Sequence, residues 1–134
     1  MIVSKTDSLP IRSSTDIVLI RQAVRKWSGE LGFSLVDQTK MITAASELAR
    51  NSLDYGGGGA VRFEMIQEGM KRGLKLVFED QGPGIADIEQ ALTDGYTSGK
   101  GMGLGLGGAK RLVNAFEIAS RVGEGTRVTI TRWK

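Results

Sequence analysis

Residues 74–84 read LKLVFEDQGPG. The apolar side chains in the first half of this stretch alternate along the chain, which is the pattern of a strand with one buried face. The strand ends near Asp80, and Gly82 and Gly84 follow it around a proline, so the chain turns there. This pattern has two explanations. It is typical of an ordinary turn, and it is also typical of a ligand site in which the carboxylate accepts from a ligand amine and the glycines let the backbone approach the ligand closely.

The elements on either side of this strand follow from hydrophobic periodicity and capping residues. Apolar residues recur at helical spacing from Ile17 to Leu31, and a glycine run, residues 56–59, ends the next helix. Before the strand we expect an edge strand over residues 8–13, a helix to about Leu31, a longer helix from Ser34 to about Tyr55, a strand over Ala60–Glu68 and a hairpin connection over residues 69–73. After it we expect a short helical stretch near Asp87–Thr93, a loop from Asp94 to Gly101, a long helix from about Leu104 to Ala115, and a hairpin of strands 118–122 and 127–133.

This order of elements predicts an α+β fold with a mixed, mainly antiparallel sheet and helices on one face. A doubly wound fold is excluded because its strands and helices would alternate. The chain has 134 residues, of which 40% are hydrophobic and 25% charged. Since domains commonly run about 100 to 200 residues, we expect a single domain over residues 1–134.

Composition excludes several kinds of chemistry. The chain has no Cys and no His, so it has no disulfide, thiolate nucleophile, Ser-His-Asp triad or phosphohistidine. Its 18 Lys and Arg residues occur in runs of two at most, which argues against a nucleic-acid partner. The N-terminus lacks the apolar segment of a signal peptide, and no stretch approaches about 18 apolar residues. We therefore expect a cytoplasmic protein without a membrane partner.

Glycine is the exceptional residue type, because 9 of the 19 glycines fall within residues 82–108. The alternating glycines of Gly101–Gly107 run into an amphipathic helix, where free N–H groups and the helix dipole favour a phosphate. A flexible loop or close helix packing would explain the same pattern. The spacing Gly103–Gly108 matches a dinucleotide motif, but no strand precedes it. The segment Gly95–Gly101 is one residue short of a P-loop and lacks the Ser or Thr after Lys100.

A second candidate lies in the longer helix, where Glu47 and Asn51 stand one turn apart on the same polar arc. The Asn51 side-chain oxygen can bind Mg²⁺. The Glu47 carboxylate can act as a general base for a hydroxyl or water. A solvated helix face is the alternative explanation for this pair.

The order and spacing of these three motifs resemble those of the GHKL (Bergerat-fold) ATPase family, over a stretch from about Ser34 to the end of the chain. Within the family the chain is similar to the short switch-protein serine/threonine kinases of bacterial stressosomes. The residues that carry this likeness are Glu30-Leu31-Gly32-Phe33, Ser46-Glu47-Leu48-Ala49-Arg50-Asn51, Glu79-Asp80-Gln81-Gly82-Pro83-Gly84-Ile85 and Lys110-Arg111-Leu112.

The resemblance implies a two-layer α/β sandwich that binds ATP in an open cleft. In the family's arrangement Asp80 accepts from the adenine amino group, Thr126 supports that end through water, and the glycine run wraps the phosphates under a lid formed by residues 94–100. The resemblance assigns the catalytic base to Glu47 and the Mg²⁺ ligand to Asn51. The implied ATP-binding residues are Asn51, Asp80, Gly82, Gly84, Lys100, Gly101, Met102, Gly103, Leu104, Gly105, Gly107 and Thr126.

The resemblance also implies a function. The gyrases, chaperones and mismatch-repair ATPases of the family need further domains, and a histidine kinase needs a phosphoacceptor His. What remains is a free-standing kinase that transfers the ATP γ-phosphate to Ser or Thr of STAS-domain stressosome proteins. Such kinases also activate a PP2C-type phosphatase by binding it. The alternative is a nucleotide-gated anti-sigma or other regulatory binding protein without essential kinase activity.

Overall fold

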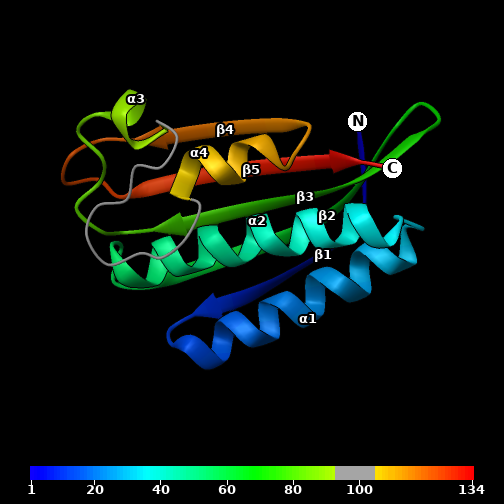
Figure 1. Ribbon diagram of the computed structural model, residues 1–134, viewed down its shortest axis with the longest axis horizontal. Coiled ribbons are helices and arrows are strands. Elements are labelled where there is room, and N and C mark those ends of the chain that lie inside the picture. The colour runs from blue at the N-terminus through cyan, green and yellow to red at the C-terminus, as the bar shows by residue number, and fades with distance from the viewer. Residues whose placement is uncertain (93–104) are drawn as a thin grey trace.

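The computed structural model describes residues 1–92 and 105–134, which form a two-layer sandwich of one sheet and four helices (Figure 1). Helices α1, α2 and α4 cover one face of a five-stranded sheet with strand order β1-β2-β3-β5-β4. Every pairing between the described strands is antiparallel, so the predicted α+β fold is confirmed. The elements are β1 (Ile2–Ile11), α1 (Ser14–Glu30), α2 (Leu35–Asp54), β2 (Gly59–Glu68), β3 (Lys71–Asp80), α3 (Ile88–Ala91), α4 (Gly105–Arg111), β4 (Ala115–Ser120) and β5 (Thr126–Trp133).

The two long helices match the prediction closely. Ser34 caps α2, because its hydroxyl oxygen accepts from the backbone N–H of Asp37. Gly32 follows α1 with φ +83°, the left-handed conformation that glycine adopts after a helix end. The apolar stripe of α1 is buried throughout, and its residues are Ile17, Ile20, Val24, Trp27 and Leu31.

Four predicted boundaries are wrong. Strand β1 begins at Ile2 rather than residue 8, because this mostly exposed edge strand pairs with β2 through its backbone and shows no hydrophobic alternation. The β2–β3 turn is only Gly69 and Met70, since β3 already begins at Lys71. Helix α4 ends at Arg111, and β4 begins at Ala115 rather than residue 118. The backbone N–H of Asn114 donates to the Thr131 carbonyl at 2.9 Å and so draws the chain into the sheet.

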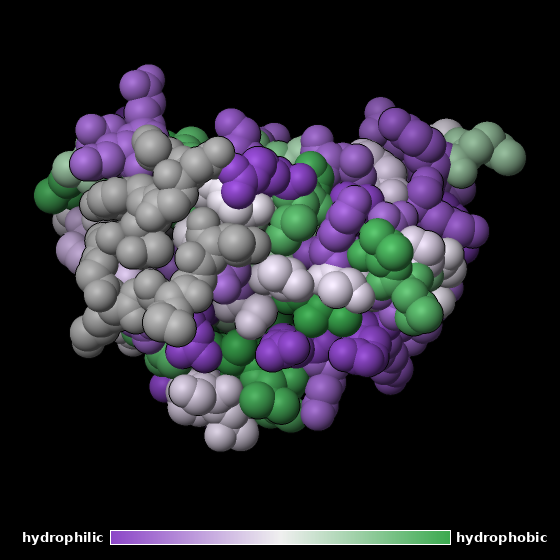
Figure 2. Space-filling view, viewed as in Figure 1, coloured by the Kyte–Doolittle hydropathy of each residue, from purple (hydrophilic) through white to green (hydrophobic). Residues whose placement is uncertain are grey.

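The core lies between the sheet and the helices. The Trp27 ring of α1 packs on the Phe63 ring of β2, with the ring centroids 5.4 Å apart. The opposite sheet face carries charged side chains, among which Arg62 pairs with Glu64 and Glu79. On the side shown in Figure 2, exposed apolar residues form separate small groups among polar ones. Within residues 1–92 and 105–134, none of the helices has the length and apolar character needed to span a membrane.

Two carboxylates make the fold sensitive to acid. Asp16 accepts from the Arg12 guanidinium and backbone N–H, and Asp37 accepts from the Arg132 guanidinium, so the pKa of each carboxyl lies below its usual value. In the unfolded chain both carboxyls titrate near pH 4 and bind protons more readily. The free energy of unfolding should therefore be fully maintained above about pH 4 and fall as the pH drops through the lowered pKa values.

Urea unfolding at a series of pH values tests this expectation. Asp16→Asn should be less stable than the wild type at neutral pH and should lose less stability as the pH falls below about 4. Gln22→Ala removes an exposed amide of α1 that does not titrate and serves as the control, with a pH profile parallel to that of the wild type. If the Asp16→Asn profile were also parallel, the Arg12–Asp16 pair would not stabilise the fold.

Candidate active site

A cleft of about 540 Å³ opens at the end of the sheet where β3 ends and α4 begins. Figure 1 shows these two elements in the ribbon. The C-terminal half of α2 forms one wall, and the segment from β3 to α3 forms another. The described residues that line it are Glu47, Leu48, Arg50, Asn51, Ser52, Asp54, Tyr55, Gly56, Phe78, Asp80, Pro83, Gly84, Ile85, Ala86, Asp87, Gln90, Ala91, Gly105, Leu106, Thr126 and Val128.

Helix α2 directs Glu47 and Asn51 into this cleft. Both side chains are half-buried and line the cleft. The buried Leu48 and Ala49 fix the rotation of the helix against the core. The pair therefore lies in the lining of the cleft, one helical turn apart on α2.

Asp80 is the last residue of β3 and lies across the cleft from α2 in the lining. One of its carboxylate oxygens, Oδ1, accepts from the backbone N–H of Gly82 at 2.9 Å. This bond holds the turn after β3 against the carboxylate. Asp80 therefore presents a half-buried acceptor to the cleft, as adenine recognition would need.

The glycines after β3 are required by close contacts between backbones. A Cβ on Gly82 would overlap the backbone of Gly56, and a Cβ on Gly84 would overlap the Arg121 carbonyl. Gly84 also has φ +78°, which side chains rarely adopt. Gly84 lines the cleft, whereas Gly82 acts through its bond to Asp80.

Thr126 and Asp80 are brought together by the β3–β5 register, in which they are paired residues. The Thr126 hydroxyl lies 2.8 Å from Ser120 Oγ. Ser120 Oγ also accepts from the Ile85 N–H at 2.8 Å and donates to the Gly125 carbonyl at 3.0 Å. Ser120 thus ties the turn after β3 to the β4–β5 turn. The sequence gives no motif for Ser120, whose role appears only from its pairing with Thr126.

The glycine run is described only from α4 onward. Gly105 begins α4 with φ +69° and lines the cleft together with Leu106. Gly107 is buried within α4 and is not among the described lining residues. The predicted lid over residues 94–100 and the predicted ATP contacts at Lys100, Gly101, Met102, Gly103 and Leu104 lie outside the described residues.

The donor set of the cleft fits Mg²⁺ only in company with a nucleotide. Asn51 offers one amide oxygen, and no group of three or more His, Cys, Asp or Glu side chains able to hold a metal occurs in residues 1–92 and 105–134. Mg²⁺ prefers one or two protein oxygens together with phosphate oxygens and water. A Mg²⁺ ion at Asn51 would therefore need further oxygens from water or phosphate.

Residues 36–134 match the family described as histidine kinase-, DNA gyrase B-, and HSP90-like ATPases. The match covers most of the chain, and the chain belongs to this family. It is 46% identical over 123 residues to the serine/threonine-protein kinase RsbT of Bacillus subtilis (strain 168), and the similarity covers 92% of both chains. The chain is therefore a homologue of a protein serine/threonine kinase with the ATPase domain of this family.

Further relatives are regulators of sigma factors. An anti-sigma F factor of Clostridium beijerinckii is 30% identical over 130 residues, which cover 91% of this chain and 89% of the relative. Two solved structures share the fold. The structure of the RsbU and RsbW domains of Rv1364c from Mycobacterium tuberculosis aligns with TM-score 0.64 and 20% identity, over 98% of this chain and 33% of the other. The mycobacterial sensor histidine kinase MprB aligns with TM-score 0.57 and 18% identity, over 96% and 97%.

Proposed function

We propose that the chain is a single-domain protein serine/threonine kinase that uses ATP and Mg²⁺ to phosphorylate STAS-domain antagonist proteins. The observation that carries the proposal is the cleft itself, which brings Glu47 and Asn51 of α2 to the same space as Asp80 of β3. The similarity to RsbT supports the choice of a serine/threonine kinase among the activities of the family. We further propose that the protein activates a PP2C-type phosphatase by binding it.

Each residue of the cleft has a role in this proposal. Asp80 accepts from the adenine amino group, and Gly82 and Gly84 hold the turn beside it. Asn51 would hold Mg²⁺, which would supply positive charge that neutralises the phosphates. Glu47 takes the proton of the incoming Ser or Thr hydroxyl while the hydroxyl oxygen bonds to the γ-phosphorus. The bond from the γ-phosphorus to the β–γ bridging oxygen breaks, and ADP leaves.

Removing the metal ligand tests the nucleotide site directly. ATP should bind the wild type about tenfold more tightly with Mg²⁺ than without it, whereas Asn51→Ala should bind ATP equally in both conditions. A tenfold difference corresponds to about 1.4 kcal/mol, close to the lower limit of the contribution of one hydrogen bond to a charged group. Titration calorimetry with and without Mg²⁺ measures this.

The control is Gln22→Ala, which removes an exposed amide from α1, outside the described lining of the cleft. It should keep the wild-type response to Mg²⁺. A wild type that binds no adenine nucleotide while folded would overturn the proposed function. If Mg²⁺ strengthened ATP binding to Asn51→Ala as much as to the wild type, Asn51 would not be a ligand of the metal.

The similarity to anti-sigma F factors favours a second candidate, a nucleotide-gated regulatory binding protein. The two functions differ in the product. After incubation with ATP, Mg²⁺ and a STAS-domain partner, a kinase leaves phosphate on the partner, whereas a pure binding protein forms a complex and leaves the partner unmodified. The position of Glu47 in the cleft supports the kinase, because a binding protein does not need a base there.

A further inference from the structure

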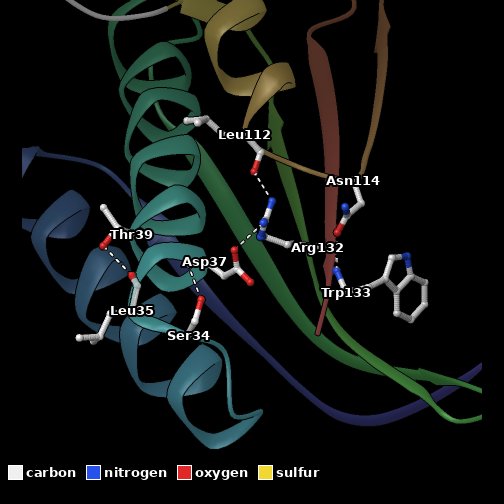
Figure 3. A network of polar contacts seen from close by, with 8 residues as sticks. All are labelled: Ser34, Leu35, Asp37, Thr39, Leu112, Asn114, Arg132 and Trp133. Atoms are coloured by element: carbon white, nitrogen blue, oxygen red, sulfur yellow. Dashed lines mark hydrogen bonds and ion pairs between the residues drawn. The ribbon is translucent and has the colours of Figure 1, made fainter.

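Helices α2 and α4 frame the cleft, and both extend away from it. Asn51 and Glu47 lie in the last turns of α2, and Gly105 begins α4, so these ends face the cleft. The other ends, the first turn of α2 and the residue after α4, lie together on the far side of the helix pair (Figure 3). Helix α4 has only seven residues and is about 10 Å long. Its two ends are therefore only about two helical turns apart.

Arg132 of β5 joins the two far ends. Its Nη2 donates to Asp37 Oδ1 in the first turn of α2 at 2.6 Å, and its Nη1 donates to the Leu112 carbonyl after α4 at 2.9 Å. Figure 3 shows the guanidinium between the two helices. Asn114, two residues after Leu112, accepts from the backbone N–H of Trp133 at 2.7 Å. The backbone N–H of Asn114 also donates to the Thr131 carbonyl. Both neighbours of Arg132 in β5 therefore bond to Asn114, which holds the chain after α4 against the sheet.

Stability alone is a weak reason for this arrangement. The Arg132 side chain is only 14% exposed, and its Nε is buried without a hydrogen-bond partner among the described residues. An ion pair whose arginine is largely buried with an unsatisfied donor is often matched in stability by apolar residues of the same size. A methionine in place of Arg132 would fill the space but would join neither helix end.

We propose that Arg132 is a positioning residue for nucleotide binding, which holds α4 against α2 through Asp37 and the Leu112 carbonyl. The inference rests on the proposed function, because the two cleft ends of these helices would contact the metal and the phosphates. With the bridge intact, the spacing between Asn51 and Gly105 is set before ATP arrives. Without it, only a fraction of the molecules has the competent spacing, and the apparent affinity for ATP falls by that fraction.

The test compares ATP binding and turnover in four proteins at a temperature where each is folded by circular dichroism. Arg132→Met should raise the ATP dissociation constant and KM about tenfold and change kcat less than threefold, because saturating ATP selects the competent arrangement. Arg132→Lys should give an intermediate KM. Asp37→Asn should raise KM as well, and in the double variant with Arg132→Met it should add nothing further.

Arg12→Met is the matched control. Arg12 forms a second Arg–Asp pair with the buried Asp16, at 3.1 Å, and is not among the described lining residues. It should lower the unfolding temperature and leave the ATP KM unchanged. If Arg132→Met or, should that variant fail to fold, Asp37→Asn behaved like Arg12→Met, the positioning role would be overturned while the proposed function stood. A wild type without ATP binding would overturn both.

Discussion

Glu47→Gln lowers phosphotransfer to a STAS-domain partner by about 10²–10⁴-fold in our expectation, the range that general-base catalysis contributes. The half-buried carboxylate lies in the cleft beside Asn51, where it can receive the hydroxyl proton. Glutamine has nearly the same size but cannot take a proton. ATP affinity should stay within about threefold, because the base contacts the acceptor hydroxyl rather than the adenine or the metal. Transfer of labelled phosphate under single-turnover conditions measures the loss.

Glu117→Gln provides the matched comparison, since Glu117 is an exposed residue of β4 outside the described lining of the cleft. Its phosphotransfer should equal that of the wild type. A Glu47→Gln protein that transfers phosphate at the wild-type rate would exclude Glu47 as the base. A protein that loses ATP binding in parallel would instead assign Glu47 to the nucleotide site.

Asp80→Asn should weaken ATP binding about 10- to 100-fold, the loss expected when a hydrogen bond to a charged acceptor is replaced by two opposed donors. The turn after β3 should keep its shape, because the remaining carbonyl oxygen of asparagine can still accept from the Gly82 N–H. The new amide group would face the adenine amino group donor to donor. Nucleotide titration of the folded variant measures the change.

The nucleotide base gives this prediction a sharper form. Inosine triphosphate carries a carbonyl where ATP carries the amino group, so Asp80→Asn should bind it better relative to ATP than the wild type does. Asp7→Asn, an exposed carboxylate of β1, should leave both affinities unchanged. An Asp80→Asn protein with the wild-type preference for ATP would show that Asp80 does not read the base.

Much of the fold and part of the cleft were predictable from local patterns. The stripe from Ile17 to Leu31 and the cap at Ser34 predicted α1 and α2, because both patterns depend on neighbours within one or two helical turns. The placement of Asp80 at a strand end was predicted for the same reason. Strand β1 was predicted too short, since an exposed edge strand pairs through backbone groups that leave little trace in side-chain type.

Contacts between distant segments required the folded chain. Local patterns placed Glu47 and Asn51 on one helix face, but the cleft that this face lines is formed with residues of β3, α4 and β5. The pairing of Asp80 with Thr126 and the role of Ser120 depend on strand register, which no local motif sets. The bridge from Arg132 to Asp37 spans 95 residues. Helix periods, caps and turns follow from backbone geometry among near neighbours, whereas such long-range contacts arise only when the sheet and the helices pack together.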